Sequence, residues 1–272
     1  MLTSISLSFT HNSYNYEKYE AEYFSNGLRI FENQNDSVKS ARGRMLVTSA
    51  SINLARLGLK YLNRNRNDFY SELDQIMEFT KNELLLAFEI MGNKNKENYN
   101  ILFNGNVLGD ERLENGQKIR KILKSGNLGI GLIGLKECVL CLEKDEQKQY
   151  ELLISILNKL NKKCEIFSEE TKLNFNIFEP SDYHARKYFT AIDKSIYGNN
   201  KNITDKPMYE LIDTAKFIKN YEELGKVQKL LTGGNLITIK LSNKITSKRT
   251  VDLIKELIDA DIGYVKIDVG GK

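Results

Sequence analysis

The chain has 272 residues, of which 41% are hydrophobic and 28% charged, enough for the core of one large domain or two small ones. Its net charge of +4 comes from 40 basic and 36 acidic residues scattered along the chain, which argues against a nucleic-acid partner. It contains no apolar run of about 18 residues and no basic region leading into an apolar one, so we expect neither a membrane-spanning helix nor a secretory signal.

Strand-like and helix-like segments alternate along the first half of the chain. Residues 45–52 are small or β-branched and predict a strand. Asp68 can cap a helix that runs to about Met91, and Gly92 is a suitable stop for it. The apolar residues of this helix fall at helical spacing: Leu73, Ile76, Met77, Leu84, Phe88 and Met91.

The second half continues the alternation. It predicts, in order, a helical turn or two at 118–124, a buried strand at 128–133, helices at 135–142 and 149–162, a strand at 173–178, a helix from Ser181 to about Phe189, a strand at 236–241, a helix at 247–260 with the stripe Val251, Ile254, Leu257 and Ile258, and a strand at 262–269. Residues 198–206 read as a polar loop. Strands separated by helices favour βαβ units, so we expect one α/β domain over residues 1–272 with parallel strand pairing.

Four glycines surround the junction between the strand at 128–133 and the helix that follows: Gly126, Gly129, Gly131 and Gly134. Their spacing is neither that of a Walker loop nor that of a dinucleotide fingerprint. Two interpretations remain open. The glycines allow tight packing of strand against helix, or they let an anion approach the free amides at the helix N-terminus.

Several short motifs, in a shared order, resemble those of the anaerobic, glycyl-radical ribonucleoside-triphosphate reductases. GLIGLKE at 131–137 resembles the family's G-[FYL]-[IV]-G-L-x-E, and NLARL at 53–57 resembles N-L-P-R-[IL] with alanine in place of proline. ENGQKIRKILKSG at 114–126 lies between them at the family's spacing. Further matches follow: the strand at 173–178, Arg186, Asp193 and Gly198, Thr204-Asp205-Lys206, Tyr209, Thr232-Gly233-Gly234, and Ile262-Gly263-Tyr264. The resemblance spans about residues 23–268.

The resemblance implies a fold related to the family's ten-stranded α/β barrel. For this chain we expect a parallel half-barrel or curved open sheet, with helices outside, corresponding to the C-terminal part of that barrel. In the family, a glycyl radical generates a thiyl radical on a finger-loop cysteine. The matching segment here is Gly27-Leu28-Arg29. Leucine has no weak S–H bond, so it cannot relay a radical, and we expect no catalytic residue in this chain.

Other departures from the family point the same way. The sequence ends at Lys272, about where the family's four-cysteine zinc site and glycyl-radical loop would begin, and we expect neither here, nor the nucleotide-binding cone. The family's T-N-S segment is replaced by Glu210-Leu211-Ile212. The resemblance places Asn53 on the barrel interior, where it can bond a substrate or fix the neighbouring loop. Gly129, Gly131 and Gly134 complete the substrate-binding site that we expect.

The remaining candidate residues favour no metal or cofactor. Cys138 and Cys141 are near neighbours on a predicted helix and fit the core better than a zinc half-site, because no second pair exists. With Cys164 they form an odd set, which is typical of a reducing cytoplasm. His11 is expected on the surface. His184, at a helix start, is either a surface residue or an acid–base group without a neighbouring nucleophile.

Three functions remain open for such a chain. It is a shortened reductase that needs a second chain for the cysteine, zinc and radical glycine. Alternatively, it is a catalytically silent relative that binds a nucleoside triphosphate or a regulatory partner, or a remnant without an independent role. Unpaired strand edges of a half-barrel would favour self-association.

Overall fold

The computed structural model describes residues 4–8, 22–24, 26–30, 33, 35, 41, 43–99, 113–198, 209–242 and 246–269. His11 lies outside these residues, and so does the predicted loop at 198–206 apart from Gly198. Within the described parts of the chain, no helix is both long enough and apolar enough to cross a membrane.

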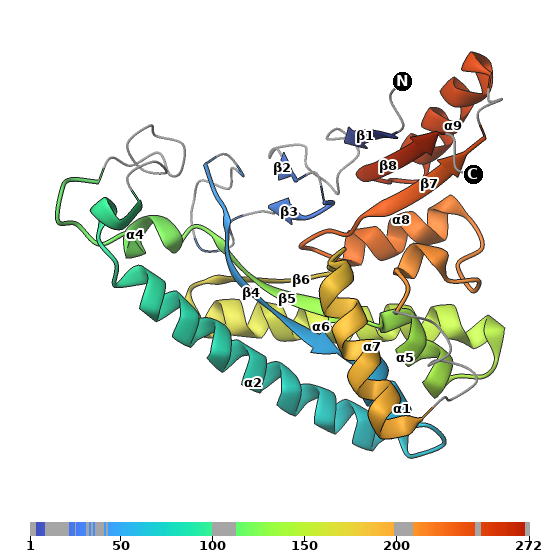
Figure 1. The fold of residues 1–272 in the computed structure, drawn as a ribbon, viewed down its shortest axis with the longest axis horizontal. Coiled ribbons are helices and arrows are strands. Elements are labelled where there is room, and N and C mark those ends of the chain that lie inside the picture. Colours follow the sequence, from blue (N-terminus) through green and yellow to red (C-terminus); the bar gives the residue numbers. More distant parts are fainter. Residues whose placement is uncertain are drawn as a thin grey trace.

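A parallel three-stranded sheet forms the centre of the molecule (Figure 1). It consists of β4 (Leu46–Asn53), β5 (Asn127–Ile133) and β6 (Asn174–Phe178), in that order, with β5 in the middle. Every residue of β5 is buried, which explains its nearly continuous apolar and glycine-rich sequence. The register aligns Ser51 with Gly131, and Gly131 with Phe178.

Two long helices cover one face of this sheet, and Figure 1 shows both on the same side of it. α2 (Arg66–Gly92) packs on β4, and α6 (Glu146–Thr171) packs on β6. The side chains of Asn65 and Asp145 cap their N-termini, by accepting from the amides two residues further on. The strands contribute alternate residues to the shared core: Val47, Ile52, Leu128, Ile130, Leu132, Phe175 and Ile177.

Three helices lie near the carboxyl ends of the same strands: α1 (Leu54–Lys60), α5 (Leu135–Leu142) and α7 (Tyr183–Tyr197). α1 and α5 pack closely, because Gly58 has no side chain: a Cβ there would lie 2.7 Å from the Cα of Cys138. Shorter helical segments occupy the connections: η2 (Lys96–Tyr99), α4 (Arg120–Leu123) and η3 (Ile212–Thr214).

The C-terminal part of the chain builds a second, smaller sheet. β7 (Ile237–Leu241) runs parallel to β8 (Tyr264–Val269), and β1 (Ser4–Ser8) pairs with the other edge of β8 in antiparallel orientation. α8 (Tyr221–Leu230) and α9 (Ser247–Asp259) contribute to its separate apolar core. The side chain of Gln228 ties α8 to this sheet, because it donates to the carbonyl of Tyr264 at 2.9 Å and accepts from the amide of Gly263 at 2.8 Å.

A turn at 232–234 links the two sheets and a strand pair from the N-terminal region, β2 (Glu22–Tyr23) with β3 (Arg29–Ile30). The amide of Gly233 donates to the carbonyl of Ile177 at 2.7 Å, and its carbonyl accepts from the amide of Arg29 at 2.8 Å. The next residue, Gly234, forms a β-bridge with Leu28. The N-terminal segment is thereby held at the free edge of β6.

The α/β prediction with parallel pairing is confirmed for the central sheet, and the predicted alternation of strands and helices is observed. The described strands do not form one continuous parallel sheet. They form two three-stranded sheets and one two-stranded sheet, and both β1 with β8 and β2 with β3 pair in antiparallel orientation. Two predicted caps were wrong: Asn65 and Asp182 take the positions expected for Asp68 and Ser181, because their side chains reach the free amides of the first turn.

Candidate functional site

The face of the central sheet that α2 and α6 leave uncovered is made mostly of small and polar residues. We call it the polar face, and it consists of Leu46, Ser49, Ser51 and Asn53 from β4, Asn127, Gly129, Gly131 and Ile133 from β5, and Asn174, Asn176 and Phe178 from β6. Parallel sheets are usually apolar on both faces. Ser49 and Ser51 of the edge strand β4 are exposed on this face, and a departure of this kind from an apolar face marks a candidate binding surface.

Gly129 and Gly131 make this face flat. A Cβ at Gly129 would lie 2.9 Å from Cε1 of Phe178, and one at Gly131 would overlap the hydroxyl oxygen of Ser51. Because these two glycines have no side chains, those of Phe178 and Ser51 can pack over β5. Gly134 has a left-handed backbone with φ of 74° at the N-terminus of α5, and a Cβ there would overlap that of Ala55. Close packing accounts for all three glycines, and their predicted binding role stays a prediction.

Asn53 lies at the junction of β4 and α1, and both the oxygen and the nitrogen of its side-chain amide form hydrogen bonds. Its oxygen caps α1 by accepting from the amide of Arg56 at 3.0 Å, and its nitrogen donates to Oδ2 of Asp193 at 2.7 Å. Asp193 is fully buried, and it also accepts from the guanidinium of Arg56 at 2.5 Å and from the hydroxyl of Tyr209. Burial, together with this bond, raises the pKa of Tyr209. The structure thus brings together Asn53, Asp193 and Tyr209, three residues of the family-like motifs.

Three carboxyl groups lie in the segments that follow the carboxyl ends of β5 and β6: the buried Glu137 in α5 and Glu179 directly after β6, and the partly buried Asp213 in η3. Each accepts one backbone hydrogen bond. Glu179 accepts from Ile212 at 2.7 Å, Glu137 from Glu210 at 3.0 Å, and Asp213 from Thr238 at 2.8 Å. The second oxygen of each is buried without a partner.

Burial raises the pKa of all three carboxyl groups. The pKa of Glu179 reaches about 8, first through burial and then through the charge of Asp213. The sequence reasoning missed this cluster. The glutamate that ends GLIGLKE was the one available signal, because Glu179 and Asp213 are distant in sequence and belong to no recognised pair.

Leu28, which stands at the position matched to the finger-loop cysteine, lies at this same end of the sheet. Its β-bridge partner Gly234 also accepts a hydrogen bond from the amide of Glu179 at 3.0 Å. The following residue, Asn235, is fully buried, and neither polar atom of its side chain has a partner. Buried groups of this kind mark a place where water or a polar ligand completes the hydrogen bonding.

The cysteines and the described histidine do not contribute to this site. Cys138 and Cys164 belong to the main core, and Cys141 packs in a smaller cluster with Ala55. Burial raises the pKa of all three thiols, that of Cys141 to about 12. His184 is exposed, and its ring meets that of Tyr183 edge-on.

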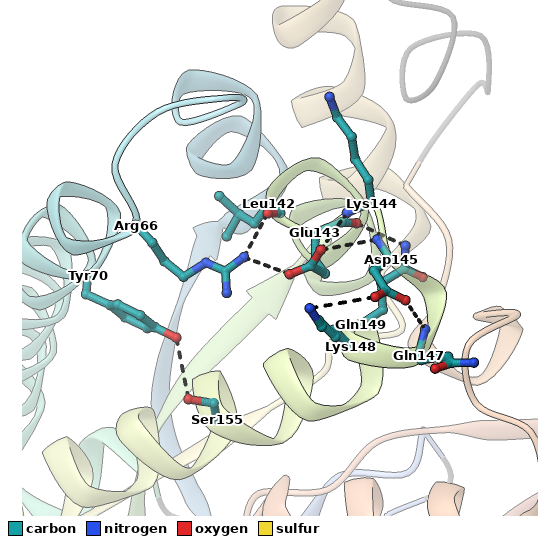
Figure 2. A network of polar contacts seen from close by, with 10 residues as sticks. All are labelled: Arg66, Tyr70, Leu142, Glu143, Lys144, Asp145, Gln147, Lys148, Gln149 and Ser155. Carbon is teal, nitrogen blue, oxygen red and sulfur yellow. Dashed lines mark hydrogen bonds and ion pairs between the residues drawn. The ribbon is translucent and has the colours of Figure 1, made fainter.

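A separate polar network joins the start of α2 to the turn between α5 and α6 (Figure 2). Arg66 donates to the carbonyl of Leu142 and to the carboxylate of Glu143, both at 3.0 Å. Glu143 in turn accepts from the amides of Lys144 and Asp145 at 3.0 and 3.1 Å. These bonds fix the geometry of two helix starts, and they account for the network without a ligand.

Comparison with known proteins identifies the family. The family model for anaerobic ribonucleoside-triphosphate reductase matches residues 2–269. A solved "Anaerobic ribonucleotide reductase" is similar with a TM-score of 0.64 and 17% identity, over 81% of this chain and 35% of that chain.

Two structures of the enzyme from Thermotoga maritima are similar with a TM-score of 0.65. The one in complex with dATP and CTP is 18% identical over 85% of this chain and 40% of that one. The one with MES in the active site is 19% identical over 85% and 41%. The chain thus spans about two fifths of these solved structures, and a search of curated proteins gave no match. On the family match, this chain belongs to the anaerobic ribonucleoside-triphosphate reductase family.

Proposed function

We propose that the polar face and its carboxyl end bind a nucleoside triphosphate. In open α/β sheets, ligands bind outside the carboxyl ends of the strands. Here that edge carries Asn53, the start of α5 after Gly134, and buried carboxyl groups with free oxygens. The Thermotoga maritima relative was solved with dATP and CTP, which supports a ligand of this class. Gly129 and Gly131 would lie in the floor of the site, where the side chains of Phe178 and Ser51 pack over them.

We further propose that this chain alone does not reduce ribonucleotides. The observation that supports this proposal is Leu28, which stands at the matched position and forms a backbone bridge with Gly234, the residue whose carbonyl accepts from the amide of Glu179. The radical step of the family needs a thiol at the matched position, and the three thiols described here are buried in packed cores. A complementing chain would have to supply the cysteine. We also propose that residues 1–272 form a single α/β domain with the architecture of a half-barrel.

Reduction is tested by anaerobic incubation of the chain with the family's activating enzyme, S-adenosylmethionine, a reductant and nucleoside triphosphates. We expect no deoxynucleotide, because Leu28 stands where the family has its thiol. Deoxynucleotide formed by the purified chain alone would refute the proposed inactivity.

Binding is tested by calorimetric titration with ATP and CTP. We expect Ser51→Ala to weaken binding a few-fold, because one exposed hydroxyl is lost from the polar face, corresponding to about 1 kcal/mol. Gly131→Val should abolish binding, because its side chain would fill the floor. Ser71→Ala, an exposed change on α2, is the matched control and should leave the affinity unchanged. If both the Ser51 and the Gly131 variant fold normally and bind the nucleotides with the affinity of the wild type, this location of the site is contradicted.

A further inference from the structure

A cavity of about 370 Å³ opens at the free edge of β6 between α6 and the end of α8. Its volume lies within the range of roughly 300–1,000 Å³ that is typical of small-molecule sites. Its lining is rich in amides, with Asn176 on the floor, Asn158 and Lys162 of α6 on one wall, and Lys229 and Thr232 on the other.

The walls of this cavity are held in place by hydrogen bonds. Asn161 donates to the carbonyl of Leu230 at 2.7 Å and accepts from the hydroxyl of Thr232 at 3.2 Å. The amide of Ile177 in β6 donates to the same hydroxyl at 3.4 Å. α6, β6 and the end of α8 are thus tied together around the opening, so the cavity is a built feature of the fold.

One floor residue is left without a partner. Asn176 is only 4% exposed, and its side-chain oxygen is buried with no hydrogen bond. Its neighbours differ, because Asn174 donates to the carbonyl of Gly126 at 3.2 Å and Asn127 accepts from Arg44 at 2.7 Å. A buried amide oxygen without a partner is unfavourable by about 1–3 kcal/mol, unless a donor from water or a ligand reaches it.

The rim of the cavity carries two lysines, Lys162 and Lys229, and one exposed carboxylate, Glu165, so its net charge is positive. Lys162 is exposed and takes part in none of the ion pairs found among the described residues, and Lys229 lies across the opening. An ammonium group recognises phosphate as a point charge, whereas an amide suits hydroxyl groups, which both donate and accept. Among the described residues the lining has one ring, Phe175, and this ring is buried against Phe167 of α6, so the described lining offers a base no exposed ring to stack on.

From these contacts we propose that the cavity binds a small phosphorylated sugar. Its phosphate lies at Lys162 and Lys229, and its hydroxyl groups bond Asn158 and the unpartnered oxygen of Asn176. This site opens at the free edge of β6 and does not involve Asn53 or Gly131, so it differs from the one proposed for a nucleoside triphosphate, although Asn176 belongs to both the polar face and this cavity.

The test is calorimetric titration of the full chain with D-ribose 5-phosphate, with D-ribose, inorganic phosphate and AMP as comparison ligands. We expect ribose 5-phosphate to bind with a submillimolar Kd. Lys162→Met should weaken it about tenfold and Asn176→Leu about fivefold or more. Lys148→Met, at the far end of the same helix, is the control and should have no effect. Asn53→Ala should likewise leave this affinity unchanged, which separates the result from the fate of the nucleotide site.

Four outcomes would overturn the proposal. They are no heat at about 10 mM ribose 5-phosphate, equal binding of inorganic phosphate, at least tenfold tighter binding of AMP, and undiminished affinity in Lys162→Met. Asn176 is buried, so its variant is interpreted only if its circular dichroism and unfolding transition match those of the wild type. Lys162 is exposed, and its variant provides the test that does not depend on folding.

Discussion

Glu179 should make the protein less stable as the pH rises from about 4.5 to 8. Its carboxyl group is 3% exposed, and burial, strengthened by the charge of Asp213, raises its pKa from 4.5 to about 8. The folded state therefore keeps a proton that the unfolded chain releases between about pH 4.5 and 8. The stabilisation from this proton is complete below pH 4.5, and it is lost as the pH rises through 8.

The size of the effect follows from the shift. A difference of about 3.5 between 4.5 and about 8 corresponds to roughly 5 kcal/mol in total, and to roughly 4 kcal/mol between pH 5 and pH 9. Glu179→Gln removes this titration and keeps an oxygen that can accept from the amide of Ile212. We expect the variant to gain about 4 kcal/mol relative to the wild type between pH 5 and pH 9.

The assay is urea unfolding followed by circular dichroism at several pH values from 5 to 9, with the free energy of unfolding compared between the two proteins. Glu151→Gln, an exposed carboxylate on α6, is the matched control, and its difference from the wild type should stay within about 0.5 kcal/mol. The difference in free energy of unfolding between Glu179→Gln and the wild type should change with pH. A change of less than about 1 kcal/mol over this range would refute the raised pKa of Glu179.

Three further predictions concern packing and hydrogen bonding. Gly58→Ala should destabilise the fold by about 1–3 kcal/mol in urea unfolding, because its Cβ would press on Cys138; an unchanged midpoint would contradict the close contact of α1 with α5. Asn53→Ala should lower the free energy of unfolding by about 2 kcal/mol or more, because α1 loses its cap and buried Asp193 loses a donor; a loss below about 0.5 kcal/mol would show that these bonds are replaced by water. Cys164 should react with a thiol reagent only at the rate of unfolding, since its thiol is buried and its pKa raised; a fast reaction under native conditions would place it at the surface.

Local sequence determined the main elements of the central sheet. The run from Asn127 to Leu142 predicts a buried strand and a following helix because apolar residues are continuous, glycines mark the junction and no polar alternation interrupts them. The ordered motifs also determined the family. Boundaries were less accurate: α6 extends to Thr171, well beyond the predicted end, because contacts with β6 continue to support it.

Tertiary structure decided which helix faces are buried and where the polar groups meet. In α9 the predicted stripe was partly wrong, since Val251 is 50% exposed, whereas Leu253 and Leu257 pack on the small second sheet. Periodicity gives the amphipathic character of a helix, but the neighbouring surface selects the angle at which it packs.

The candidate site depended on tertiary structure even more strongly. The position of Leu28 comes from its bridge to Gly234, and the raised pKa of Glu179 comes from its burial near Asp213. These residues are distant in sequence and have no local pattern. The sequence could therefore specify the residue types at the site, whereas the desolvation and proximity that set their chemistry exist only once the chain has folded.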